Sequence, residues 1–139
     1  MKTQSILSCA VGTSLFVLLA VPSFAHHSVG SEFDVKNCRD FTGVLTKLSW
    51  QNPHMWFMVD VKDPSGKVES WMFQGFSTLT ITRAGTPRED FLENIGKEVQ
   101  VRGCLARSGA EHKAAAGTLK FLSDGRVREV GQLQDPAGN

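Results

Sequence analysis

The sequence predicts a mainly β domain, in which five or six strands form a barrel and one short helix lies between the third and fourth strands. Three observations support this prediction. Apolar side chains occupy every second position from Met55 to Val61, which is the period of a half-buried strand. Other segments rich in β-branched and aromatic residues are separated by short turn signals. One further segment, which begins at Thr86, carries the signals of a helix start.

The first 25 residues have the pattern of a secretory signal peptide. Lys2 supplies the positive charge, residues 6–21 supply the apolar region, and Ser23-Phe24-Ala25 places small residues before a cleavage site. A membrane anchor and a lipoprotein site at Cys9 are the alternatives, but the apolar segment is short for a membrane span. We therefore expect cleavage after Ala25, a periplasmic or secreted protein, and no stable membrane insertion after cleavage.

The exported chain is expected to form one domain without internal repeats. The predicted parts are a signal peptide at 1–25, an N-terminal arm at 26–40, the barrel domain at 41–131 and a frayed tail at 132–139. The formal net charge of the chain is +1, and loss of Lys2 with the leader brings it to zero. A neutral chain lacks the basic surface that binds nucleic acids, so we expect no nucleic-acid partner and consider an envelope protein as the partner.

The strand segments are separated by turns that have a stated mechanism. The predicted strands are residues 41–50, 54–63, 68–76, 97–105, 114–122 and 127–130. Asp63-Pro64-Ser65-Gly66 joins the second strand to the third, with Pro at the second turn position and Gly at the fourth. Trp71 and Phe73 are expected to face the core from the third strand.

The predicted helix begins with a capping box. Thr86 is the expected N-cap, Pro87 the first helical residue and Glu89 the residue that closes the box. The buried face of this helix is expected to consist of Phe91, Leu92 and Ile95.

This order of elements is that of the oligonucleotide/oligosaccharide-binding (OB) barrel. In that barrel the first and fourth strands are antiparallel neighbours, so Cys38 near the start of the first is expected to meet Cys104 near the end of the fourth. Export favours a disulfide between them, and two unrelated thiols are the alternative. The alternative fold is a small open α+β sheet.

Three short motifs resemble those of a family of small exported bacterial proteins of unknown function. They are His26-His27-Ser28, Asn52-Pro53-His54-Met55-Trp56 and Asp124-Gly125-Arg126. The resemblance covers essentially the whole chain after the leader. It implies the fold and the compartment of that family and brings no established activity with it.

The histidines suggest a metal site. Cleavage after Ala25 would make His26 the terminal residue, whose α-amine and imidazole Nδ1 can chelate one ion. His54, at the start of a strand, is the expected second imidazole ligand, and His27 is a reserve ligand. Amine and imidazole ligands suit copper(II), which binds most tightly among the divalent first-row ions. Met58 lies about 13 Å from His54 along an extended strand, so these two are not expected to share an ion.

Two alternatives to the metal site stay open. The histidines can have plain structural roles, with His54 packed beside Trp56. Trp56 and Trp50 can instead form an aromatic face that binds a small organic or saccharide ligand or a protein partner.

The sequence shows no serine triad, nucleophile elbow, phosphate loop or zinc-protease helix. It therefore favours a binding or accessory protein over an enzyme.

Overall fold

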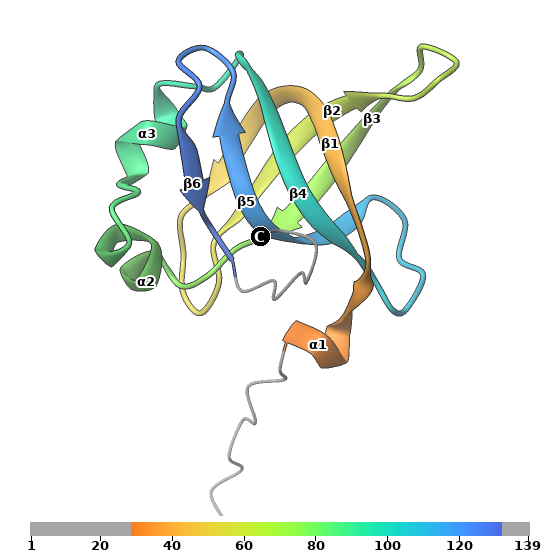
Figure 1. Cartoon of the computed structure of the whole chain (residues 1–139), viewed down its shortest axis with the longest axis horizontal. Helices are drawn as coiled ribbons and strands as arrows, with labels where there is room; N and C mark the ends of the chain where they lie inside the picture. The colour runs from red at the N-terminus through yellow and green to blue at the C-terminus, as the bar shows by residue number, and fades with distance from the viewer. Residues whose placement is uncertain (1–28, 132–139) are drawn as a thin grey trace, which may run out of the picture.

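Six strands form one sheet that closes into a barrel. The computed structural model describes residues 29–131. The elements are α1 (Val29–Glu32), β1 (Phe33–Ser49), β2 (Trp56–Lys62), β3 (Val68–Gln74), α2 (Thr78–Arg83), α3 (Arg88–Leu92), β4 (Glu98–Ala106), β5 (Lys113–Phe121) and β6 (Val127–Glu129). The sheet order is β3-β2-β1-β4-β5-β6, and a parallel pairing of β3 with β5 closes the barrel, with β6 outside it (Figure 1). The predicted OB-like barrel is thereby confirmed.

Strand β1 is the longest strand and bends so that it pairs with two neighbours. Its first part pairs with β4 and its last part with β2, and Gly43 pairs with both. A β-carbon at Gly43 would overlap the backbone carbonyl of Asp60, so this close approach requires glycine. The strand begins at Phe33, earlier than the predicted start at Phe41, because residues 33–40 pair with β4 without showing a clear period of two.

The core is filled by inward-facing side chains of the strands. Met55, Phe57 and Val59 are fully buried, which confirms the predicted inward face of the second strand. Trp71 and Phe73 are buried on β3, as predicted. The ring centroids of Phe57 and Phe73 lie 5.4 Å apart, and aromatic pairs of this kind add about 0.5–1.5 kcal/mol beyond the area that they bury.

Two short helices, where one was predicted, connect β3 to β4. The hydroxyl of Ser77 caps α2 by accepting a hydrogen bond from the backbone N–H of Thr80. The predicted capping box at Thr86 is wrong, because the N-cap of α3 is Pro87 and makes no side-chain cap hydrogen bond. The N–H of Thr86 donates to the carbonyl of Ile81 in α2, and its buried hydroxyl has no partner within residues 29–131. Thr86 therefore hydrogen-bonds back to α2 and does not cap α3.

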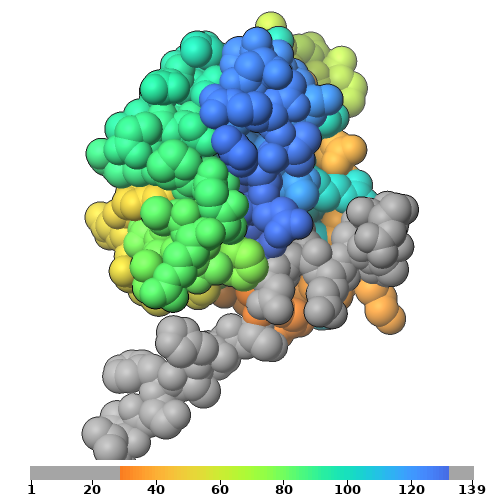
Figure 2. Space-filling view, turned by 60° about the vertical axis from the view of Figure 1, so that its left-hand side comes forward, coloured from red at the N-terminus to blue at the C-terminus, as the bar shows by residue number. Residues whose placement is uncertain are grey.

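The apolar face predicted for the helix after Thr86, which is α3, is confirmed only in part. Phe91 is fully buried, whereas Leu92 and Ile95 are 40% and 41% exposed. The helix ends at Leu92, so Ile95 lies in the turn that follows and no longer shares a helical face with Phe91. Figure 2 shows the helical segment packed beside the chain that carries β6. Within residues 29–131 no helix is long and apolar enough to cross a membrane.

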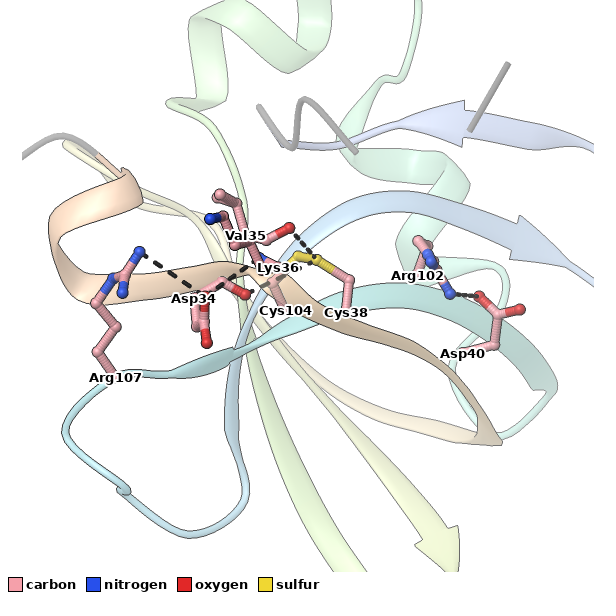
Figure 3. Close-up of a disulfide and its surroundings, with 8 residues drawn as sticks. All are labelled: Asp34, Val35, Lys36, Cys38, Asp40, Arg102, Cys104 and Arg107. Atoms are coloured by element: carbon pink, nitrogen blue, oxygen red, sulfur yellow. Dashed lines mark hydrogen bonds and ion pairs between the residues drawn. A yellow bond between two sulfur atoms is a disulfide. The ribbon is translucent and has the colours of Figure 1, made fainter. Parts of the chain in front are cut away.

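A disulfide joins the neighbouring strands β1 and β4, as predicted. Cys38 and Cys104 are direct partners in the antiparallel register, and their Cα atoms lie 3.9 Å apart. Ion pairs between Asp34 and Arg107 and between Asp40 and Arg102 connect nearby positions of these segments (Figure 3). The predicted pairing of the first and fourth strands, and the predicted disulfide, are both present in the structure.

Candidate functional site

The turn between β1 and β2 is anchored to the start of α2. The Asn52–Pro53 peptide bond is cis. The side-chain oxygen of Asn52 accepts hydrogen bonds from the backbone N–H of Thr78 at 3.2 Å and from its hydroxyl at 3.0 Å. The backbone N–H of Met55 donates to the carbonyl of Phe76. These bonds hold Asn52 and Met55 in place, so His54, which lies between these two residues, has a defined position where the turn meets β2.

The imidazole of His54 is half-buried and held through one ring nitrogen. Its Nδ1 lies 3.2 Å from the backbone carbonyl oxygen of Gly75. A carbonyl can only accept, so Nδ1 carries the proton, and Nε2 of the neutral ring keeps its lone pair. Within residues 29–131 no partner occupies Nε2. Histidines that bind metals commonly donate their second ring nitrogen to a carbonyl in this way.

The structure places only one of the three predicted metal ligands. His26 and His27 lie outside the described residues, so their predicted roles stay predictions. Among residues 29–131, no three side chains of His, Cys, Asp or Glu come together as a metal-binding group. His112 lies elsewhere, with its Nε2 3.1 Å from a carboxylate oxygen of Glu69.

The two tryptophans predicted to form one aromatic face lie in different surroundings. Trp50 packs partly buried against the core, with its ring centroid 5.8 Å from that of Phe91. Trp56 faces outward from the start of β2, because the inward positions of that strand are Phe57 and Val59. Trp50 is therefore partly covered by core contacts, whereas Trp56 lines the outer surface of the barrel.

An open depression of about 260 Å³ lies on the outer face beside Trp56. Strands β1, β2 and β3 supply its lining, which consists of Lys47, Ser49, Trp56, Met58 and Met72. The sequence indicates Trp56 as a ligand-binding candidate but does not reveal the two methionines as neighbours, because their proximity depends on the register of β2 with β3.

At the edge of this depression, the ammonium group of Lys113 lies over two aromatic rings. The ammonium of Lys113, at the start of β5, lies 5.3 Å from the ring centroid of Trp56 and 5.6 Å from that of Phe33. The same ammonium forms an ion pair of 2.6 Å with the carboxylate of Glu32 at the end of α1. These contacts connect the end of α1 to the start of β2, although 24 positions of sequence separate Glu32 from Trp56.

The Asp-Gly-Arg motif shapes the hairpin between β5 and β6. The carboxylate of Asp124 accepts hydrogen bonds from the backbone N–H of Arg126 at 2.9 Å and from its Nε at 2.7 Å. The pKa of Asp124 is lowered below its usual range. The backbone hydrogen bond from Arg126 is the largest cause, and the hydrogen bond from its guanidinium is the second. Arg126 also pairs with Asp90 of α3 at 3.1 Å, so the motif ties the hairpin to the helix. This geometry is structural.

Comparison with known proteins gives one match. A model that describes a family of unknown function (DUF6152) matches residues 15–115, which is most of the chain. No curated protein and no solved structure matches the chain. The chain therefore belongs to DUF6152, a family of unknown function.

Proposed function

We propose that this protein is an exported binding protein of the cell envelope that holds copper(II) through His54 and the processed N-terminus. The observation that supports this most directly is the bond between Nδ1 of His54 and the carbonyl of Gly75. It sets the tautomer and the orientation of the ring before any metal arrives, so Nε2 is ready to ligate.

The remaining ligands come from the segment that precedes α1. Cleavage after Ala25 leaves His26 as residue one, with an α-amine and an imidazole that chelate together, and His27 beside it. Val29 follows three positions after His26, and an extended segment of that length spans about 10 Å. Amine and imidazole nitrogens of this kind suit copper(II), whereas calcium and magnesium prefer oxygen ligands.

The position of α1 supports this proposal. Glu32 pairs with Lys113, and Lys113 lies on the ring of Trp56, two residues after His54. Figure 1 places α1 and the turn between β1 and β2 at the same end of the barrel. The end of α1 is thus linked through Lys113 to the start of β2, two residues after His54.

The test is calorimetric titration of copper(II) into protein whose first residue is His26. His54→Ala should weaken binding by about tenfold or more, because one fixed ligand is lost. His112→Ala, which removes the other described imidazole, is the matched control and should bind like the wild type. Binding should also weaken on acidification, because protonated imidazole cannot ligate. A His54→Ala variant with unchanged affinity would refute the shared site.

A second candidate function is suggested by the depression beside Trp56. A small organic or saccharide ligand could stack on the indole, with Lys47 and Ser49 as polar contacts and no metal at His54. Under this hypothesis, Trp56→Ala removes ligand binding and His54→Ala leaves it unchanged. Screening of fragments by protein NMR, with both variants in parallel, separates the two functions.

A further inference from the structure

Two methionines face each other on the outer surface of the barrel. Met58 on β2 and Met72 on β3 are direct partners in the antiparallel register, and both line the depression beside Trp56. A third methionine, Met55, is fully buried in the core. Outward-facing strand positions usually carry polar or β-branched residues, so core packing does not account for two adjacent thioethers there.

The geometry lets the two sulfur atoms reach one ligand. Cross-strand partners have β-carbons about 4.5–5.5 Å apart. Methionine is unbranched and has three rotatable side-chain bonds, so the two sulfur atoms can converge on a point in the depression. Thioether sulfur is a soft ligand that selects copper(I) over the harder divalent ions.

The indole of Trp56 adds a second attraction for a cation. Its ring already carries the ammonium of Lys113 at 5.3 Å, which shows that a positive charge is accepted at this ring. That ammonium is paired with the carboxylate of Glu32 at 2.6 Å, so its own charge is largely offset locally. A monovalent ion at the two sulfur atoms would lie beside the same aromatic ring.

From these contacts we propose that the depression formed by Met58, Met72 and Trp56 is a binding site for a soft monovalent metal ion, copper(I) or its analogue silver(I). The two thioethers are the ligands, and the indole covers the ion on one side. Besides Lys113, whose charge is offset by Glu32, Lys47 contributes a positive charge to the lining, and this charge opposes the ion. Lys47 is exposed on β1 and its long side chain can turn into solvent, so the repulsion weakens binding without preventing it.

This site is independent of the copper(II) site proposed above. Its ligands are sulfur atoms, and Met58 lies about 13 Å from His54 along the strand, too far to share an ion. Each proposal can therefore fail without the other.

The experiment is titration of silver(I) nitrate into protein with ¹³C-labelled methionine methyl groups. The buffer contains no chloride and no thiol, which leaves the Cys38–Cys104 disulfide intact. The methyl signals of Met58 and Met72 should shift together and saturate at one equivalent, while that of Met55 stays in place. This measurement on the wild type is decisive by itself, since silver that binds without moving the two signals would overturn the proposal.

Variants measure the contribution of each ligand. Met58→Leu and Met72→Leu nearly conserve volume, so the fold should persist, and each should lower the silver affinity by about tenfold or more. The double variant should bind no silver at this site. Met55→Leu is the matched control and should bind like the wild type.

Two further variants distinguish a thioether metal site from an anion site and from a site that includes His54. Lys47→Gln should tighten silver binding by about two- to fivefold, because an exposed like charge is removed. A site built for an organic anion would instead depend on that lysine. His54→Ala should leave both methyl shifts unchanged, and loss of the shifts in this variant would contradict a pure thioether site.

Discussion

Asp90 shows how one residue joins parts of the chain that are distant in sequence. Its carboxylate is nearly buried and accepts hydrogen bonds from the guanidinium groups of Arg126 and Arg128, each at 3.1 Å. A buried carboxylate is costly unless it is paired, and two arginines satisfy both of its oxygen atoms. Asp90 therefore holds α3 against the hairpin of β5 and β6.

The first prediction concerns this cluster. Asp90→Ala should lower the free energy of unfolding by about 2–3 kcal/mol, because it removes two charge-assisted hydrogen bonds and leaves two arginines facing each other. Urea denaturation monitored by circular dichroism measures the change. Glu93→Ala, an exposed site just after the same helix, is the control and should stay within about 0.5 kcal/mol of the wild type. Equal stability of Asp90→Ala and the wild type would show that the cluster is not structural.

His54 and Trp56 show the limits of sequence interpretation at this scale. The sequence correctly indicates that Trp56 lies on the outward side of β2, because alternation assigns faces. It does not indicate which ring nitrogen of His54 carries the proton, since that depends on the carbonyl of Gly75, 21 residues away. The thioether pair is hidden in the sequence for the same reason, as Met58 and Met72 meet only through the strand register.

Among the elements, the turn between β2 and β3 forms as its sequence predicts. One carboxylate oxygen of Asp63 accepts hydrogen bonds from the hydroxyl of Ser65 at 2.6 Å and from the N–H groups of Ser65 and Lys67. Gly66 adopts a positive φ of 88°, which glycine tolerates best. The hydrogen bond from the Ser65 hydroxyl is the main cause that lowers the pKa of Asp63.

This lowered pKa gives a pH-dependent prediction. A carboxyl whose pKa is lower in the folded state stabilises the fold above its unfolded pKa, and the contribution is lost as pH falls through the folded value. Asp63→Asn should therefore have a lower melting temperature than the wild type at pH 7, and the difference should shrink below about pH 4, the usual range of aspartate. Thermal melts across pH measure this, with Asp60→Asn on the adjacent strand as control. A difference that persists unchanged into acid would contradict the role of the charged carboxylate.

The helical connection is the element that the sequence predicts least well. The motif at Thr86 has the residues of a capping box, yet the backbone of Thr86 is used by α2. Two helices of six and five residues are too short for a helical period to specify their faces, so packing decides them. Strands are predicted better, because period two is visible within a few residues.

For the molecule as a whole, the disulfide closes a long loop between the neighbouring strands β1 and β4. Cys38 and Cys104 are separated by 66 positions, and a chain-entropy estimate for that loop is about 4 kcal/mol. The double variant Cys38→Ser, Cys104→Ser should lose a large part of this stability in guanidinium denaturation. Dithiothreitol should destabilise the wild type and leave the double variant unchanged. If reduction has no effect on the wild type, the bond does not stabilise the barrel.

The sequence by itself determined the β class, the strand segments, the inward face of β2 and the pairing of the two cysteines. These follow from local alternation, turn residues and the order of elements, all of which act over short distances or through a known topology. Only the tertiary structure decided that β3 pairs with β5, that Trp50 packs on the core while Trp56 stays outside, and that Met58 and Met72 line one depression. The physical reason is that alternation specifies which face of a strand is buried, whereas the neighbours on its outer face depend on register and closure.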